Sequence, residues 1–288
     1  MTVRIITDSG SDLSTSVINE LGIIVMPCMV SYDGIEFEDG VTTNSKAILD
    51  GMRDGKKYKT SQVPTQKFRQ TFLSLAEKGE EAIFISFSSD LSGTYLSALM
   101  AYDKVIEKYP SFKCEIINSQ CVSLGLGFVV KQAALWAKKG MPREELVRKI
   151  KSLSLNMENI FTVDDMDYLY RGGRISFTKA FIGGLLNYKP ILHIENGKMI
   201  PIEKIQGRKK SIDFMVELFG RRGNLQDKDQ LIAICHGDDM KAVELLKSKL
   251  SQRYGMKNFM VNIIGCAVGA HCGPGSMGLF FTNKRYQA

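Results

Sequence analysis

Three short polar clusters interrupt the apolar runs of this 288-residue chain, and each offers small hydrogen-bond donors. They are residues 60–62 (Thr-Ser-Gln), 88–94 (Ser-Ser-Asp-Leu-Ser-Gly-Thr) and 271–275 (His-Cys-Gly-Pro-Gly). Hydroxyl groups, an imidazole and backbone N–H groups can all donate hydrogen bonds to an anion. Because the clusters are far apart in the sequence, we expect the fold to assemble them in a cleft between elements or domains, where ligand pockets commonly lie.

His271 differs in its setting from the other two histidines. His193 falls inside a predicted strand and His236 at the end of one, so we interpret both as packing or loop-anchoring residues. His271 precedes a Gly-Pro-Gly turn whose backbone can approach a ligand closely, and its imidazole can donate to an anion or orient a neighbouring donor. We therefore interpret His271 as a functional residue.

Common catalytic and metal-binding motifs are missing or out of context. The chain has no GxxxxGK[ST] phosphate loop and no GxSxG nucleophile motif. Residues 273–278 match GxGxxG, but a strand-like run follows in place of the helix that a dinucleotide site requires. Cys235-His236 and Cys266 with His271-Cys272 lack the spacing of a structural zinc site, so we expect no bound metal.

Length and composition predict a globular protein with two domains. A chain of 288 residues with 44% hydrophobic content can bury a large core. It has no N-terminal apolar segment and no run long enough to span a membrane, so we expect a soluble cytoplasmic protein. The six cysteines lack CxxC spacing and a secretion signal, which indicates reduced, mostly buried thiols.

The formal net charge of +7 comes from 38 basic and 31 acidic residues. The densest basic runs are residues 56–59 and 208–210, and neither carries the series of interleaved aromatic residues that binds single-stranded nucleic acid. We interpret both runs as solvated faces and expect no nucleic-acid partner.

Strands and helices alternate through the first half of the chain, which predicts a parallel sheet covered by helices on both faces. Pro27 indicates an edge or an irregularity in its strand. Asn44 and Thr65 are the predicted N-caps of two helices. The predicted strands are 3–7, 23–30, 82–87 and 114–117, with a polar loop over 33–40 and helices over 13–21, 44–55, 65–79, 93–108, 124–139 and 142–153.

The pattern changes near residues 156–159, where antiparallel strands enter. Asn196-Gly197 is a strong hairpin signal between two strands. The predicted strands are 160–163, 189–194, 199–205, 230–235, 258–264 and 279–282, with a polar segment over 164–176 and helices over 178–186, 211–219 and 239–254. We therefore predict an α/β protein with an N-terminal three-layer α/β/α domain, residues 1–157, and a C-terminal α/β domain with a mixed sheet, residues 158–288.

Taken in order, the polar clusters resemble those of the DegV family of bacterial fatty-acid-binding proteins. The resemblance runs nearly end to end, and its most specific parts are the Arg-Gly-Gly-Arg-Ile-Ser segment at 171–176 and the order of the whole set. The set comprises Thr7-Asp8-Ser9, residues 60–62, residues 88–94, residues 165–176, Lys189-Pro190-Ile191 and residues 271–275.

The resemblance implies a two-domain DegV-like fold that holds a long-chain fatty acid and performs no catalysis itself. Family members present the fatty acid to a separate ATP-dependent fatty acid kinase, which phosphorylates the carboxylate for phospholipid synthesis. By motif position, Thr60 or Ser61 and Ser92 would bind the carboxylate, while Gly93, Arg174 and His271 would support the head-group site. We further expect transient contact with a membrane surface, and no cofactor apart from the bound lipid.

The chemistry of these residues agrees with a fatty-acid ligand. Burying about fifteen methylenes gains on the order of 0.8 kcal/mol each, whereas a buried carboxylate needs convergent donors. Ser92 and Gly93 precede a predicted helix, whose N-terminal N–H groups favour an anion.

Ordinary structural roles and other functions remain open from the residues alone. Thr60 and Ser61 would then close a turn, Ser92 would be a helix N-cap, Arg174 an ion-pair member and Asp8 a cap for the helix carrying Leu13. One alternative function is acyl or phosphoryl transfer on a small metabolite, with His271 as base or covalent carrier. The other is nucleic-acid binding, suggested by the pI near 9.0 and the two basic runs.

Overall fold

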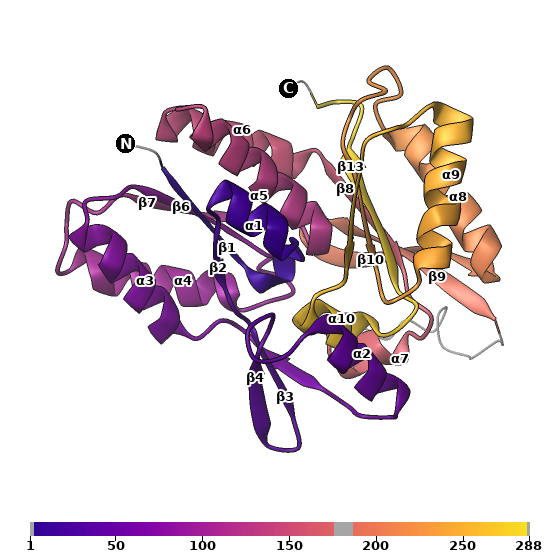
Figure 1. Cartoon of the computed structure of the whole chain (residues 1–288), viewed down its shortest axis with the longest axis horizontal. Helices are drawn as coiled ribbons and strands as arrows, with labels where there is room; N and C mark the ends of the chain where they lie inside the picture. The colour runs from indigo at the N-terminus through magenta and orange to yellow at the C-terminus, as the bar shows by residue number, and fades with distance from the viewer. Residues whose placement is uncertain (1–2, 176–186, 287–288) are drawn as a thin grey trace.

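A computed structural model of the chain describes residues 3–175 and 187–286. Within these residues the strands form a four-stranded sheet in the order β2-β1-β6-β7, a six-stranded sheet in the order β10-β9-β8-β13-β11-β12 and a small sheet in the order β4-β3-β5. Helices cover the two larger sheets, while the small sheet projects from the lower part of the molecule (Figure 1).

The four-stranded sheet is parallel throughout and is covered by helices on both faces, as predicted. Alternate residues of its strands enter two separate cores: Ile6 and Phe84 pack with the α3 and α4 side, and Ile5 and Ile83 with the α5 side. Its elements are β1 (Arg4–Asp8), β2 (Ile24–Met26), β6 (Ala82–Ser86), β7 (Cys114–Asn118), α1 (Thr15–Leu21), α3 (Thr65–Glu77), α4 (Thr94–Ile106), α5 (Ser123–Lys138) and α6 (Arg143–Leu155).

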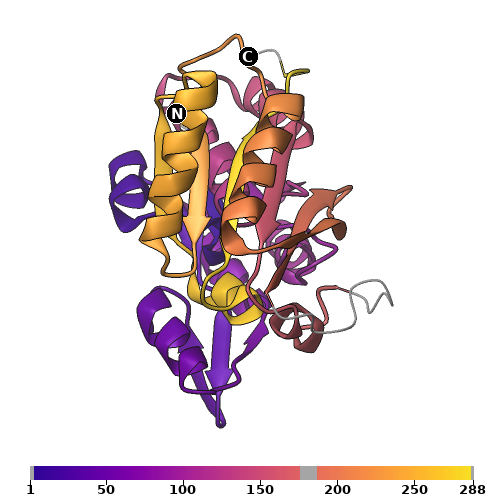
Figure 2. The ribbon, with the colours of Figure 1, turned by 90° about the vertical axis from the view of Figure 1, so that its right-hand side faces the viewer.

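The six-stranded sheet is mixed, again as predicted. Only its β11–β12 pair is parallel, and Asn196 and Gly197 form the β9–β10 hairpin turn with φ angles of 50° and 80°. Helices α8 and α9 lie over one face (Figure 2). Its elements are β8 (Met157–Thr162), β9 (Tyr188–Glu195), β10 (Lys198–Gln206), β11 (Ile232–His236), β12 (Phe259–Ile263), β13 (Met277–Thr282), α8 (Arg208–Arg222) and α9 (Met240–Tyr254).

Helix α5 lies between the two larger sheets, which explains its burial on nearly all sides (Figure 1). One hydrophobic core joins Ile83 of the four-stranded sheet, Leu124 and Val130 of α5, and Phe280 of the six-stranded sheet. The two halves of the chain therefore share a core across α5. The domain boundary between residues 157 and 158 stays a prediction.

The small sheet corrects two predictions for residues 23–40. The single strand over 23–30 was wrong, because the chain leaves β2 at Pro27 and enters β3 (Met29–Tyr32) in a different sheet. Pro27 has no N–H to continue a ladder. The polar loop over 33–40 was also wrong, since Asp33 and Gly34 turn the chain into β4 (Ile35–Glu38), which pairs with β3. The third strand is β5 (Lys59–Ser61).

Three short helices complete the described fold. Asn44 caps α2 (Ser45–Arg53), as predicted, by accepting a hydrogen bond from the backbone N–H of Ala47. The sequence patterns missed α7 (Asp167–Arg171) and α10 (Cys266–Cys272), which span five and seven residues. Helix α10 packs against α2 and α7.

Two further helix predictions concern the N-cap of α3 and residues 178–186. Pro64, and not Thr65, occupies the N-cap position of α3, because Thr65 already adopts the helical conformation. The helix predicted over 178–186 lies outside the described residues. None of the described helices has the length and apolar character needed to cross a bilayer.

Candidate functional site

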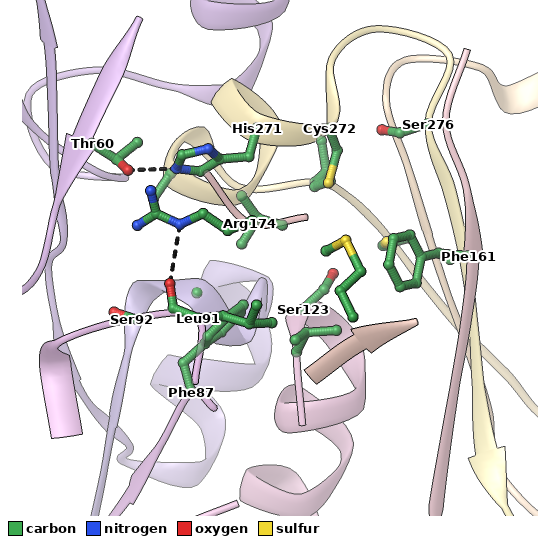
Figure 3. A pocket seen from close by; sticks show the side chains of 18 of the residues that line it. Thr60, Phe87, Leu91, Ser92, Ser123, Phe161, Arg174, His271, Cys272 and Ser276 are labelled. Atoms are coloured by element: carbon green, nitrogen blue, oxygen red, sulfur yellow. Dashed lines mark hydrogen bonds between the residues drawn. The ribbon is translucent and has the colours of Figure 1, made fainter. Parts of the chain in front are cut away.

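A largely apolar pocket lies between α10, the ends of the four-stranded sheet and the inner face of the six-stranded sheet. Its empty space is about 860 Å³, including the part that opens to solvent. Leu91, Val122, Phe161, Leu169 and Phe280 are among its apolar lining residues. Four of its polar side chains, those of Thr60, Ser92, Arg174 and His271, lie together in Figure 3, whereas Ser123 and Ser276 lie apart from them.

The fold brings together five of the six residues nominated from the sequence. Thr60, Ser61, Ser92, Arg174 and His271 all line the pocket. Gly93 does not line it, but is the N-cap of α4 and lies beside Gln62, which does. Thr60 and Ser61 belong to strand β5, so their alternative role of closing a turn does not apply.

Thr60 and His271 form a direct pair across the pocket mouth. Oγ1 of Thr60 lies 2.6 Å from Nε2 of His271, which stands at the last turn of α10 (Figure 3). Burial, with the charge of Arg174, lowers the pKa of His271 to about 4. The ring is therefore neutral at pH 7. In the tautomer protonated at Nε2, the ring donates to Thr60 and leaves the threonine hydroxyl free to donate to a ligand.

Arg174 places a half-buried cation at the same mouth. Its Nε donates to the backbone oxygen of Leu91 at 3.1 Å, and its Nη1 donates to that of Gly172 at 2.5 Å. Burial lowers the pKa of Arg174 from its usual value. Among the ion pairs that the described residues form, none involves Arg174, so the alternative of a structural ion pair finds no support there.

Ser92 lies at the start of α4, where its hydroxyl bonds within its own turn. Oγ of Ser92 donates to Oγ1 of Thr94 at 3.0 Å and accepts from the backbone N–H of Thr94 at 3.3 Å. Thr94 Oγ1 in turn accepts from the backbone N–H of Val63, which connects α4 to the segment after β5. The alternative that Ser92 is the N-cap was wrong in detail, because Gly93 occupies that position.

Gly172 was not singled out as a site residue, yet it packs directly against His271. A Cβ added at position 172 would overlap Nδ1 of the His271 ring. The sequence signal was present in the Arg-Gly-Gly-Arg segment, but nothing in it shows which glycine approaches which side chain. The close approach leaves the imidazole no room to move toward the Gly172 backbone.

Asp8 lines the pocket, although the sequence patterns did not assign it to the site. It is fully buried and accepts hydrogen bonds from the backbone N–H groups of Gly10 at 3.1 Å and Phe87 at 2.9 Å. Burial raises its pKa to about 7 despite these bonds. The alternative role of Asp8 as cap for the helix carrying Leu13 was wrong: Asp8 caps the short 3-10 turn η1 (Ser9–Ser11), and Ser14 caps α1.

The other two histidines have the structural settings expected for them. His193 on β9 lies 3.3 Å, through Nδ1, from Nη1 of Arg222. His236 at the end of β11 accepts through Nδ1 from the backbone N–H of Asp239. Neither lines the pocket described above.

Comparison with known proteins agrees with this architecture. The DegV family model, described as an uncharacterised protein of the DegV family, matches residues 2–284. A DegV domain-containing protein of Caldanaerobacter subterraneus subsp. tengcongensis is 33% identical over 282 residues, which cover 98% of this chain and 99% of the relative.

Solved structures of similar fold carry descriptions of lipid binding. A DegV family protein from Thermus thermophilus, described as fatty-acid-binding, has a TM-score of 0.88 and 27% identity, covering 98% of this chain and all of its own. A stearic-acid-binding protein from Eubacterium ventriosum has a TM-score of 0.88 and 25% identity, with 98% of each chain covered. With a family model that matches almost its whole length, the chain belongs to the DegV family.

Proposed function

We propose that the pocket binds a long-chain fatty acid, with the carboxylate at Arg174, Thr60 and His271 and the tail among the apolar side chains. The observation that carries this proposal is Arg174, a half-buried guanidinium without an ion-pair partner among the described residues, facing an apolar cavity. A cation in this setting favours an anionic ligand, because a charge-assisted hydrogen bond offsets the cost of desolvating both groups.

The apolar part of the pocket supports a hydrocarbon tail. Figure 3 shows Leu91 beside Ser92 and Arg174, and Phe161 of β8 across the pocket. Phe280 of β13 also lines the pocket, and most of the lining surface is apolar. Each methylene transferred from water gains on the order of 0.8 kcal/mol, so the tail supplies most of the affinity. The fatty-acid-binding relatives from Thermus thermophilus and Eubacterium ventriosum give the same ligand class.

Ser61, Ser92 and Gly93 complete the proposed head-group site. Ser61 lies beside Thr60 on β5, and its exposure leaves its hydroxyl free to reach a carboxylate at the mouth. Ser92 and the N-terminus of α4 add a favourable dipole. The bonds of Ser92 to Thr94 make it a weaker donor than Thr60.

We further propose that the chain presents its fatty acid to a separate ATP-dependent kinase in the cytoplasm. Exposed Ser61, Gln62 and Gly93 surround the carboxylate end, whereas Phe280 at the other end is buried. A carboxylate oxygen would attack the γ-phosphorus of ATP on the kinase, ADP would leave, and the acyl phosphate would supply phospholipid synthesis. Loading and release involve transient contact with a membrane surface.

The alternative in which His271 acts as a general base is disfavoured. A general base works best when its pKa lies near the operating pH, and burial lowers the pKa of His271 to about 4. Its short hydrogen bond to Thr60 fits a residue that orients a donor.

Mass spectrometry of an organic extract tests the ligand. Protein purified from a bacterial culture should carry about one long-chain fatty acid per chain, and the delipidated protein should regain thermal stability on addition of hexadecanoic acid, because a ligand of the native state stabilises by mass action. Extracts without stoichiometric lipid, together with an unchanged melting temperature, would contradict fatty-acid binding.

Hydroxylamine trapping tests the kinase partnership separately. Loaded protein with ATP and a bacterial fatty acid kinase should yield an acyl phosphate, detected as the hydroxamate, and loaded protein with ATP alone should yield none. Hydroxamate formation without the kinase would make the chain itself an enzyme. If no hydroxamate forms with a kinase that is active on another carrier protein, the proposal that this chain presents its fatty acid to a kinase is refuted.

A further inference from the structure

Helix α10 begins at a buried carboxyl group that comes from the other half of the chain. Oδ1 of Asp39 accepts a hydrogen bond from the backbone N–H of Cys266 at 2.9 Å, and Oδ2 accepts from that of Ala267 at 3.1 Å. Asp39 is 5% exposed. The two bonds span 227 and 228 positions in sequence, and they satisfy N–H groups that a helix leaves unpaired at its start.

Asp39 also belongs to the part of the fold that carries Thr60. It directly follows β4, and its backbone N–H donates to the oxygen of Cys28, just before β3. Strand β3 pairs with β5, on which Thr60 stands. Asp39 therefore connects the small sheet that holds Thr60 to the helix that holds His271.

The hydrogen bonds at the start of α10 affect the position of His271 at its end. His271 lies in the last turn of a seven-residue helix, so a shift at Cys266 reaches the imidazole without much intervening structure. A helix this short is not stable by itself and takes its position from its contacts. Asp12 holds the preceding residue, since its Oδ1 accepts from the backbone N–H of Gly265 at 2.9 Å.

We propose that Asp39 is a positioning residue for the head-group site: its paired bonds to Cys266 and Ala267 set the placement of α10, and so bring Nε2 of His271 to Thr60. A head-group site depends on such placement, because a displacement of about 1 Å in a positioned group can cost about 100-fold in function. The role in ligand recognition rests on the proposed fatty-acid function, whereas the role in placing His271 does not.

The first test needs no lipid. NMR titration of the imidazole protons in delipidated protein should show His271 neutral above about pH 5 in the wild type, in line with a pKa of about 4. In Asp39→Asn we expect the pKa of His271 to rise by at least one unit, because displacement of α10 exposes the ring to water. Removing the negative charge of Asp39 without any movement would lower the pKa of His271, so a rise in this pKa indicates that α10 is displaced.

Asp239→Asn is the matched control. Asp239 also caps a helix, since its Oδ1 accepts from the backbone N–H of Ala242 at 3.1 Å in α9, but α9, unlike α10, has no residue in the pocket lining. It should leave the His271 titration unchanged. If Asp39→Asn fails to fold, Asp39→Glu replaces it in the test. This variant keeps both acceptor oxygens but adds one methylene, which should displace α10 and also raise the pKa of His271. A folded Asp39 variant in which His271 still titrates near 4 would overturn the proposal.

The second test measures discrimination between hexadecanoic acid and hexadecan-1-ol. Asp39→Asn should lower the ratio of their affinities at least tenfold, Asp239→Asn should leave it unchanged, and His271→Ala should have little further effect in the Asp39→Asn background. Additive effects of the two substitutions would contradict action through His271. If the wild type binds neither compound, the proposed function fails, and the titration still decides the role of Asp39.

Discussion

The backbone of Gly172 lies directly against the imidazole of His271, leaving no space for a side chain at position 172. Gly172 has an ordinary φ of −72°, so its small size, and not an unusual backbone conformation, is what the site requires. The carbonyl oxygen of the same residue accepts a hydrogen bond from Arg174. One glycine therefore borders both the imidazole and the guanidinium of the proposed head-group site.

Gly172→Ala should lower fatty-acid affinity about tenfold or more with little loss of stability, because the added methyl group must displace the His271 ring. Isothermal titration with hexadecanoic acid measures the effect. Gly173→Ala is the control: Gly173 has a φ of 68° and no atom near the added Cβ, so alanine should cost about 1 kcal/mol of stability and leave affinity nearly unchanged. Equal affinities for the Gly172→Ala variant and the wild type would mean that the ring position does not matter for binding.

Thr60→Val removes a hydroxyl group while keeping the shape of the side chain. We expect affinity for hexadecanoic acid to fall by about 10- to 100-fold, since a hydrogen bond to a charged group contributes roughly 1.5–3 kcal/mol, and affinity for hexadecan-1-ol to fall much less. Thr71→Val on α3, whose hydroxyl makes only a long contact to Sδ of Met26, should change neither. A parallel loss for acid and alcohol would place the carboxylate away from Thr60.

Arg174→Met should have the largest effect among the head-group substitutions. Removing one partner of a buried charge pair costs about 2–5 kcal/mol, so we expect at least a 30-fold loss of affinity for the acid. Arg171→Met is its control, because Arg171 is exposed and lies over the Tyr168 ring at 5.0 Å. Wild-type affinity in Arg174→Met, measured by competition with a fluorescent fatty acid, would remove the basis for the proposed site.

Asp8 should make the delipidated protein less stable as the pH rises from about 4 to about 7. Its folded pKa of about 7 exceeds the model value of 3.8, so in this window the folded protein keeps a proton that the unfolded chain releases. The free energy of unfolding then falls by up to about 1.4 kcal/mol per pH unit from this group. Urea unfolding across this range should show a shallower decline in Asp8→Asn, and identical slopes would contradict a raised pKa.

The regular parts of the fold followed from the sequence because their signals are local. The buried run at Ala82–Ser86, flanked by amphipathic helices, predicts a parallel strand, and Asn196-Gly197 predicts the β9–β10 hairpin. The small sheet was missed because strands of three or four residues have little periodicity. Helix α10 was missed for a related reason: seven residues, including Gly269, give no clear helical pattern, and Asp39 holds its start from far away in the sequence.

The candidate site was predictable in its donors but not in its geometry. Thr60, Ser61 and Ser92 stood out as hydroxyl groups between regular elements, while Arg174 relied on the family resemblance. The sequence did not indicate that Thr60 pairs with His271, that Gly172 borders the ring, or that Asp8 lines the pocket. Each of these is a contact between distant segments, set by packing that no local pattern encodes.

The most direct measurement is a ¹³C NMR titration of the protein loaded with hexadecanoic acid labelled at the carboxyl carbon. If Arg174 holds an ionised carboxylate, one bound signal should appear per chain, and its pKa should lie well below the usual carboxyl range because a nearby cation favours the charged form. In Arg174→Met the pKa of any remaining bound signal should rise above that range, since burial without a cation favours the neutral acid. No bound signal, or a bound carboxyl whose pKa is the same in wild type and Arg174→Met, would contradict the proposed site.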